Sequence, residues 1–222
     1  FNFVKGDIRN KALMKKLVKD NDIIIHLAAI VGYPACRKNP ELAKSVNMDA
    51  TKLLSSLASK DQLIMFGSTG SNYGAVKEIC TEATPLNPLS LYGETKVFAE
   101  TYLLENNKTI AYRFATAFGV SPRLRLDLLI NDFTYKAIKQ GYVVVYESHF
   151  KRTFMHVHDF ARSFIFGIQN ADKMSGNAFN VGSEKMNYSK KEICEIILSK
   201  TGGYFHYADI GEDADKRNYE VS

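Results

Sequence analysis

The sequence predicts an α/β protein built around a doubly wound parallel sheet. Residues 22–28 and 62–67 are apolar runs of the length and composition typical of buried parallel strands. Helical patterns over residues 40–59 and 92–106 follow these two runs. Because strand and helix alternate in this way, we expect βαβ units whose strands lie parallel and whose helices cover the sheet.

The other elements follow from the same local patterns. Further strands are expected at residues 1–5, 109–114, 142–146, 152–157 and 178–181. Further helices are expected at residues 9–20, 127–140, 159–170 and 189–201. Residues 68–91 are rich in Gly, Ser, Asn and Pro and are predicted to form a loop.

The rhythm of strand and helix changes near residue 118, which divides the chain into two predicted regions. Residues 1–118 form the sheet-based domain, and strands from about 142–157 are expected to return to it. Residues 119–222 mainly form a smaller, mixed α/β region. Since the chain opens on Phe1 rather than on Met, we expect it to be part of a longer protein.

The composition is that of an ordinary soluble globular protein, with 45% hydrophobic and 24% charged residues among 222. The net charge of +5 is modest, which suits phosphorylated ligands but does not argue for nucleic acid. No apolar run is long enough to cross a membrane. The widely spaced Cys36, Cys80 and Cys194 fit reduced thiols in a cytoplasmic enzyme, and we expect no metal site.

The pair Tyr92 and Lys96 is the main candidate for catalysis. Residues four apart share a face of a helix, so the Lys96 ammonium is expected to lie beside the Tyr92 phenol. A nearby positive charge lowers the pKa of a phenol, which makes Tyr92 a plausible general base. Alone, however, such a pair is more often a solvated amphipathic pair.

The setting of this pair favours the catalytic interpretation. Ligands bind at the carboxyl ends of parallel strands, and the loop after the 62–67 strand carries Thr69. The loops after other strands carry Ala28 and Thr116, so several polar or small residues converge on one sheet edge. The Thr69 hydroxyl could hold the same substrate oxygen from which Tyr92 removes a proton.

A series of short motifs runs through the chain in a characteristic order. They are Gly6-Asp7-Ile8-Arg9, His26-Leu27-Ala28-Ala29, Asn47-Met48-Asp49-Ala50-Thr51, Ser68-Thr69 with Tyr73-Gly74, Tyr92-x-x-x-Lys96, Arg113-Phe114, and Arg152-Thr153-Phe154-Met155-His156-Val157. Together they resemble the extended short-chain dehydrogenase/reductases, the nucleotide-sugar epimerase/dehydratase family, over nearly the whole chain. The resemblance implies a Rossmann-like NAD-binding domain within residues 1–118 and nucleotide-sugar binding within 119–222.

The resemblance also implies roles for individual residues. NAD would be held by Asp7, Ile8, Leu27, Ala28, Ala29, Asn47, Tyr92, Lys96 and Phe114. Thr69, Tyr92 and Lys96 would be catalytic, with Lys96 binding the nicotinamide ribose and lowering the pKa of Tyr92. The nucleotide sugar would be held by Thr116, Arg123, Arg152 and Arg217. Ala28 and Ala29 could instead mark close packing after a strand, and Arg217 could be a surface residue.

Two departures from the family pattern matter. The sequence contains no glycine-rich dinucleotide loop, so we expect an N-terminal βαβ segment to be missing from it. Gly70 and Ser71 stand where 4,6-dehydratases of the family carry a titratable acid–base pair. A 4,6-dehydratase is therefore not expected. The predicted reaction is NAD-dependent oxidation and epimerisation at C4 of the sugar.

Other outcomes stay open at this stage. The same groups serve a 4-dehydrogenase or a 4-keto reductase, and a noncatalytic NAD-binding relative is a further alternative. Residues 113–127 and 211–219 resemble bacterial enzymes that act on GDP-activated heptose in capsule synthesis, including a heptose 4-dehydrogenase. The family usually dimerises through the helices matching residues 40–59 and 92–106, so a homodimer is expected.

Overall fold

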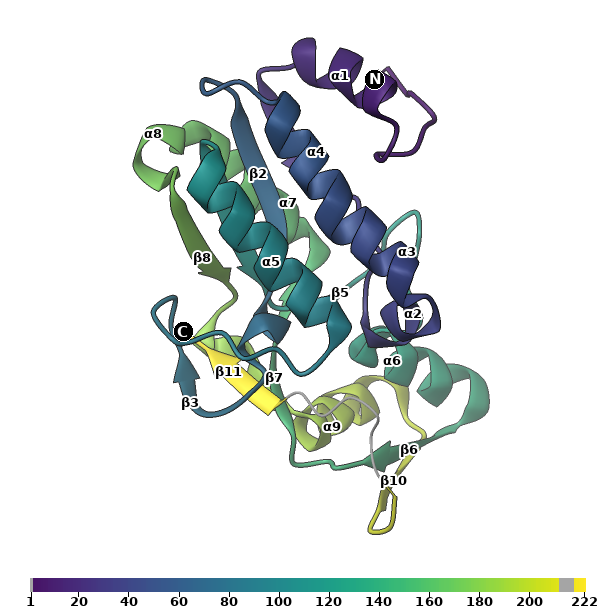
Figure 1. Ribbon diagram of the computed structural model, residues 1–222. Coiled ribbons are helices and arrows are strands. Elements are labelled where there is room, and N and C mark those ends of the chain that lie inside the picture. The colour runs from purple at the N-terminus through teal and green to yellow at the C-terminus, as the bar shows by residue number, and fades with distance from the viewer. Residues whose placement is uncertain (1, 212–217) are drawn as a thin grey trace. The chain divides into compact units, whose positions relative to one another are not determined.

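The computed structural model describes residues 2–211 and 218–222, and it divides into two compact units. The first unit comprises Phe1–Asn72, Pro88–Arg113 and Phe164–Phe179. The second comprises Tyr73–Asn87, Phe114–Ser163 and Asn180–Ser222. The units thus interleave along the chain, whereas the sequence predicted one division near residue 118. Both combine helices with strands, as expected of an α/β protein (Figure 1).

The longer helices agree with the predicted ranges, whereas the short helices α2 and α8 were not predicted. The helices are α1 (Lys11–Lys19), α2 (Tyr33–Lys38), α3 (Pro40–Lys44), α4 (Ala50–Leu57), α5 (Leu91–Asn106), α6 (Leu129–Gln140), α7 (Val157–Gln169), α8 (Ala171–Met174) and α9 (Lys190–Thr201). A π-helical turn, η1 (Ser45–Asp49), joins α3 to α4, and 3₁₀ turns cover η2 (Gly70–Tyr73) and η3 (Glu184–Met186). The single helix predicted over 40–59 is therefore three consecutive helical segments.

The strands include several that the sequence did not predict. The strands are β1 (Ile23–His26), β2 (Leu63–Thr69), β3 (Ala75–Cys80), β4 (Thr109–Phe114), β5 (Thr116–Phe118), β6 (Tyr142–Tyr146), β7 (Lys151–His156), β8 (Asn177–Val181), β9 (Asn187–Ser189), β10 (Tyr204–Ala208) and β11 (Asn218–Val221). The additional strands are β3, β5, β10 and β11, together with the short β9 at the predicted start of α9. β3 lies inside the segment expected to be a loop.

The largest sheet has the strand order β1-β2-β4-β8, with β1 and β2 parallel. Alternation along β2 sends its side chains to opposite faces of the sheet. Ile64 and Phe66 pack with Ala99 and Leu103 of α5, while Met65 lies against Gly167 of α7. Helices thus cover both faces, which is the doubly wound arrangement that the sequence predicted.

Strand β1 is at one edge of this sheet, and its surroundings differ from the prediction. The run was expected to be buried, yet Ile23 and Ile25 are 39% and 44% exposed. An edge strand has a neighbour on one side only, and among the described residues no further strand pairs with β1. The apolar composition therefore predicted the strand correctly and its burial incorrectly.

The start of the chain also differs from the prediction. Residues 2–5 were expected to be a strand, but they adopt no regular structure and Phe3 is 87% exposed. A strand needs a hydrogen-bonding neighbour, and no described strand pairs with these residues. Local β propensity was therefore not sufficient to predict whether these residues form a strand.

The second unit holds three smaller groups of strands. β6 pairs with β10, β7 lies between β5 and β9, and β3 pairs with β11. The expectation that strands within 142–157 return to the main sheet is wrong, because β8 takes the place next to β4. The β6–β10 pair and β7 instead contribute to a core with α6 and α9.

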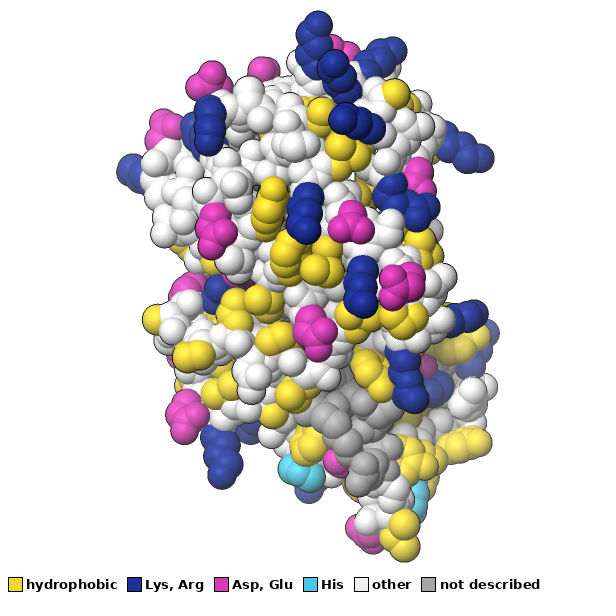
Figure 2. Space-filling model, in the orientation of Figure 1, with side chains coloured by type: hydrophobic (Ala, Val, Ile, Leu, Met, Phe, Trp, Pro, Cys, Tyr) yellow, Lys and Arg dark blue, Asp and Glu magenta, His cyan; other side chains and the backbone are white. Residues whose placement is uncertain are grey.

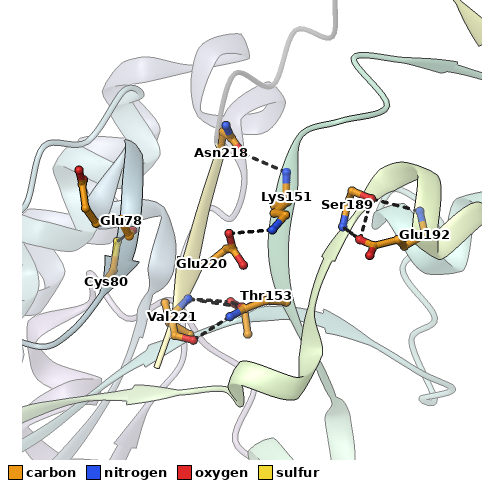
Figure 3. Close-up of polar contacts among 10 residues, drawn as sticks. Glu78, Cys80, Lys151, Thr153, Ser189, Glu192, Asn218, Glu220 and Val221 are labelled. Atoms are coloured by element: carbon orange, nitrogen blue, oxygen red, sulfur yellow. Dashed lines mark hydrogen bonds and ion pairs between the residues drawn. The ribbon is translucent and has the colours of Figure 1, made fainter.

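Strand β11 is fixed by polar contacts with β7 (Figure 3). Lys151 binds Asn218 through its backbone N–H at 2.9 Å and Glu220 through its ammonium at 3.1 Å. The backbone N–H of Val221 donates to Thr153 Oγ1 at 3.1 Å. These partners lie 67 or more positions apart in the sequence, which explains why no local pattern predicted β11.

The surface has the mixed character that the composition predicted. On the face drawn in Figure 2, Lys and Arg side chains are interspersed with acidic and hydrophobic ones. Cys36, Cys80 and Cys194 are buried and make no disulfide. Within residues 2–211 and 218–222, no helix is both long and apolar enough to cross a membrane.

Candidate active site at the start of helix α5

Helix α5 carries both members of the predicted Tyr–Lys pair in its first two turns. The helix begins where Ser90 accepts a hydrogen bond from the Gly93 backbone N–H at 3.2 Å, a typical N-cap. Tyr92 is half-buried, whereas Lys96 is only 4% exposed. The solvated interpretation of this pair is therefore excluded for Lys96.

The Lys96 ammonium lies over the ring of Phe66, 4.0 Å from its centroid. Burial lowers the pKa of Lys96 from 10.5 to about 7, because charge is disfavoured away from water, while the negative charge of Glu100 opposes this shift. The attraction between the cation and the ring face offsets part of the burial penalty. A lysine held in this way can gain or lose its charge near neutral pH.

Thr69 is at the carboxyl end of β2 and is buried. Its hydroxyl donates to Ser71 Oγ at 3.1 Å and accepts from the Ser71 backbone N–H at 3.2 Å. A Cβ placed on Gly93 would come within 3.4 Å of the Ser71 carbonyl oxygen and 2.7 Å of Pro88 Cβ. Gly93 therefore lets the Thr69 turn approach the first turn of α5, where Tyr92 lies.

Asn47 connects the loop after β1 to α5. Its side chain exchanges two hydrogen bonds with the Ile30 backbone, at 2.8 and 3.0 Å, and donates to Thr95 Oγ1 at 3.0 Å. The resemblance implies that Asn47 helps to hold NAD, and this role stays a prediction. Asn47 is in the π-helical turn η1, and such turns are frequent at functional sites.

A histidine that the sequence analysis did not select extends this network. His26 Nε2 lies 2.9 Å from Thr51 Oγ1, whose hydroxyl donates to the Asn47 carbonyl at 2.8 Å. Burial, with a smaller contribution from the charge of Lys96, lowers the pKa of His26 to about 4. The ring is therefore neutral at neutral pH. The signal available was the single histidine closing an otherwise apolar strand.

A second set of buried polar residues was also missed. Glu100 is fully buried one turn after Lys96, and it forms a salt bridge with Arg113 of β4 at 2.7 Å. Ser68 and Asn72 also donate to this carboxylate. The available signal was a carboxylate at helical spacing from Lys96, flanked by the apolar Ala99 and Leu103.

The remaining residues predicted to bind the cofactor lie at the edges of the first unit. Asp7 is exposed and binds the Arg9 side chain at 2.6 Å, which holds the pKa of Asp7 at about 2. Ile8 is half-buried beside it. Leu27 and Ala28 are exposed and Ala29 is half-buried, directly after β1. Their backbone is accessible to a ligand.

The other predicted residues belong to the second unit. Phe114 is buried and stacks on Phe160, with 4.3 Å between ring centroids. Arg152 is buried in β7, and Thr116 has a buried hydroxyl in β5. Arg123 is exposed in the loop before α6. Arg217 lies outside the described residues, so its role stays a prediction.

Comparison with known proteins agrees with this arrangement. The profile of the NAD dependent epimerase/dehydratase family matches residues 1–182. The chain therefore belongs to this family, which confirms the predicted class of enzyme and its dependence on NAD. The Rossmann-like fold of the first unit is the fold of this class.

Three individual relatives are 26–29% identical to this chain. UDP-glucose 4-epimerase of Lactobacillus helveticus is 26% identical over 229 residues, which cover 90% of this chain and 68% of that protein. The low-salt glycan biosynthesis protein Agl12 of Haloferax volcanii is 29% identical over 95% of this chain and 69% of its own length. dTDP-glucose 4,6-dehydratase of Streptomyces niveus is 26% identical over 91% of this chain and 61% of its own length.

Solved structures agree on the fold. MoeE5 in complex with UDP-glucose and NAD superposes with a TM-score of 0.85 and 24% identity, covering 99% of this chain and 75% of MoeE5. UDP-glucose 4-epimerase of Thermus thermophilus in complex with NAD superposes with a TM-score of 0.82 and 19% identity, covering 97% of this chain and 74% of that one.

The described residues fit the nicotinamide end of NAD. Lys96 provides a buried cation near the start of α5, where ribose hydroxyls can accept hydrogen bonds from its ammonium. Asn47 binds the backbone of Ile30 in the loop after β1, in which Leu27 and Ala28 are exposed. Lys96 and this loop would hold the cofactor.

Proposed function

We propose that this chain oxidises the C4 hydroxyl of a nucleotide-activated sugar and returns it with inverted configuration, as a 4-epimerase. The observation that carries the proposal is the burial of Lys96 on the helix whose first turn contains Tyr92, next to the Thr69 turn. Bound NAD would supply the hydride acceptor. The protein would supply the base and hold the substrate oxygen.

The proposed proton transfer uses three side chains. Tyr92 removes the proton from the sugar hydroxyl, because the Lys96 ammonium one turn away favours its phenolate form. Thr69 donates a hydrogen bond to the same oxygen and fixes its position. On return, Tyr92 gives the proton back to the oxygen. Lys96 also binds the cofactor ribose, so one cation serves both ligands.

The choice between epimerase and dehydratase rests on the turn after Thr69. Relatives of this chain include enzymes named for both reactions. Elimination of water needs an additional acid and base beside C5 and C6 of the sugar. Gly70 and Ser71 occupy this turn, and neither titrates near neutral pH. The turn therefore supports epimerisation, or oxidation without inversion, over dehydration.

A noncatalytic relative is the alternative from another class. The burial of Lys96 argues against it, since an uncharged side chain would fill the same space without the penalty of burying an ammonium. A protein that only binds NAD could hold the ribose hydroxyls through uncharged donors. The chemistry of proton transfer gives a reason for it.

The sugar nucleotide would be bound by the second unit. Arg152 is buried in β7, and an arginine pairs with phosphate oxygens through two parallel hydrogen bonds. Thr116 of β5 has a hydroxyl that could bind the sugar, with Arg123 and Arg217 as further candidates for the diphosphate. The narrower assignment to GDP-heptose enzymes stays a prediction from sequence.

A homodimer is proposed through α4 and α5. Phe98 and Tyr102 of α5 stack with 5.8 Å between ring centroids, and the Lys52 ammonium of α4 lies 4.9 Å from the Phe98 ring. Both rings are half-buried in the single chain, so a second copy could cover them. Sedimentation of the full-length protein tests this assembly.

Substitution of Tyr92 by Phe tests the proposed function. We expect Tyr92→Phe to lower kcat about 10²–10⁴-fold, the usual contribution of a general base, while NAD still binds. The matched control is Tyr102→Phe on the same helix, for which we expect unchanged turnover. Full-length protein would be incubated with UDP- and GDP-sugars, following C4 configuration and NADH absorbance.

The products separate the alternatives. Inversion at C4 without net NADH supports the epimerase, and net NADH supports a 4-dehydrogenase. Equal kcat for Tyr92→Phe and the unmodified enzyme would exclude Tyr92 as the base. Tight NAD binding without conversion of any nucleotide sugar would favour the noncatalytic relative.

A further inference from the structure

The carboxylate of Glu100 binds the Thr69 turn on both sides of Thr69. Ser68 Oγ, immediately before Thr69, donates to Glu100 Oε2 at 2.5 Å. Asn72, three residues after Thr69, donates to the same oxygen at 3.2 Å and to Ser68 Oγ at 3.0 Å. One carboxylate oxygen therefore fixes both ends of the segment that carries the Thr69 hydroxyl.

The same glutamate belongs to the helix that carries the proposed base. Tyr92, Lys96 and Glu100 are four residues apart in succession, so they follow one another along one face of α5. The Thr69 turn thus meets α5 at two places, through Glu100 and through the close approach of Ser71 to Gly93. Both contacts join the segment that carries Thr69 to the helix that carries Tyr92 and Lys96.

Arg113 leaves one oxygen of Glu100 available for this task. Its guanidinium donates to Glu100 Oε1 through Nε at 2.9 Å and through a terminal nitrogen at 2.7 Å. Arg113 is itself buried in β4, and its guanidinium compensates the charge of Glu100 through Oε1. Ser68 and Asn72 of the turn donate to Oε2.

We propose that Glu100 is a positioning residue, which holds the Thr69 hydroxyl at the distance from Tyr92 that the shared substrate oxygen requires. The inference rests on the proposed function, because it assumes that Thr69 and Tyr92 bind one oxygen. Glu100 touches neither substrate nor cofactor in this account. Misplacement of a reacting group by about 1 Å can lower a rate roughly 100-fold, so such positioning has a measurable effect on kcat.

Ser68→Ala is the most direct test, because it removes the hydrogen bonds that Ser68 Oγ makes with Glu100 and Asn72 and leaves the Glu100–Arg113 pair intact. Its matched control is Ser55→Ala. Ser55 is also buried and also donates at 2.5 Å, to Asn107 Oδ1 at the far end of α5. We expect similar losses of thermal stability in the two variants. Glu100→Gln would leave Arg113 uncompensated and is therefore a poorer probe.

The first measurement is steady-state turnover of the full-length protein with NAD and its nucleotide sugar. We expect Ser68→Ala to lower kcat about tenfold with KM nearly unchanged, since the interaction acts on the reacting geometry. Ser55→Ala should keep kcat within about twofold, as expected for a change far from the chemistry. Equal kcat values for the two variants would overturn the proposal.

The second measurement does not depend on activity. The methyl group of Thr69 is observed by NMR after selective threonine labelling, and its signal is identified by its loss in Thr69→Ser. We expect its order parameter to fall in Ser68→Ala and to stay constant in Ser55→Ala. An unchanged Thr69 order parameter in Ser68→Ala would contradict the inference, even if the wild-type protein converts no nucleotide sugar and the proposed function fails.

Discussion

Lys96 and Lys190 are both buried lysines near the start of a helix, yet their surroundings differ. Lys190 opens α9 in the second unit, and its ammonium donates to the Tyr146 carbonyl at 2.9 Å. Lys96 lies over the ring of Phe66, and burial lowers its pKa to about 7. Lys190 thus links the start of α9 to the end of β6. Lys96 instead has a pKa at which its side chain can gain or lose a proton near neutral pH.

This difference indicates how a functional lysine can be separated from a structural one. Burial alone does not distinguish them, since both are less than 5% exposed. Both ammonium groups lie near an aromatic ring, since that of Lys190 is 5.4 Å from the Phe150 centroid, but Lys190 also donates to a backbone carbonyl, which satisfies an ammonium better than a ring does. Replacement of Lys96 should therefore lower activity and raise stability. Replacement of Lys190 should lower stability and leave activity nearly unchanged.

The largest expected effect is on activity. We expect Lys96→Met to lower kcat about 10²–10⁴-fold, because it removes the charge that favours the Tyr92 phenolate. Lys190→Met should leave kcat within about twofold, since Lys190 binds backbone in the second unit and not the proposed base. Turnover of both variants at saturating NAD is the measurement.

Equal activities in these two variants would break the comparison. If Lys96→Met kept its turnover, burial of the ammonium would need a structural explanation like that of Lys190. If Lys190→Met lost its turnover while remaining folded, the second unit would contain a functional lysine that the geometry does not indicate.

Local sequence patterns predicted the parts of the fold that depend on local spacing. Tyr92 and Lys96 are four residues apart on a helix whose range was predicted within one residue, so their common face followed directly. The resemblance to the family is confirmed by the match over residues 1–182.

Features that depend on distant partners were not predictable in this way. The ring under Lys96 comes from Phe66, 30 positions earlier, and β3 pairs with β11 across more than 130 residues. No local pattern encodes such pairings, because they are decided by packing of the whole unit. The Glu100 set was missed for the same reason, since its partners Ser68 and Arg113 come from two different strands.

The next effect is smaller and concerns stability as a function of pH. We expect Lys96→Met to raise the free energy of unfolding by on the order of a few kcal/mol below pH 7, because it removes a buried charge. The folded pKa of about 7 is below the ordinary 10.5, so the unfolded state binds the additional proton between these values. The free energy of unfolding of the wild-type protein therefore rises between pH 7 and pH 10.5. The difference in stability between Lys96→Met and the wild type becomes smaller as the pH approaches 10.5.

Urea unfolding at several pH values checks this prediction. Lys190→Met is the comparison, and it should lose stability because the Tyr146 carbonyl loses its donor. A Lys96→Met variant that is less stable than wild type at pH 6 would contradict the view that Lys96 is buried at the expense of stability. It would also weaken the argument against a noncatalytic relative.

The smallest effects are expected for the serines at the N-termini of α5 and α9. These two positions allow an effect on activity to be distinguished from an effect on stability. Ser90 caps α5 at the Gly93 N–H, and Ser189 caps α9 in a capping box with Glu192. Either Ser→Ala change should lower the free energy of unfolding by about 1 kcal/mol. Only Ser90→Ala should also lower kcat, by a few-fold, because Tyr92 is in the turn that this cap orders. Equal kcat in both variants at equal stability would mean that the first turn of α5 does not need its cap to hold the proposed base.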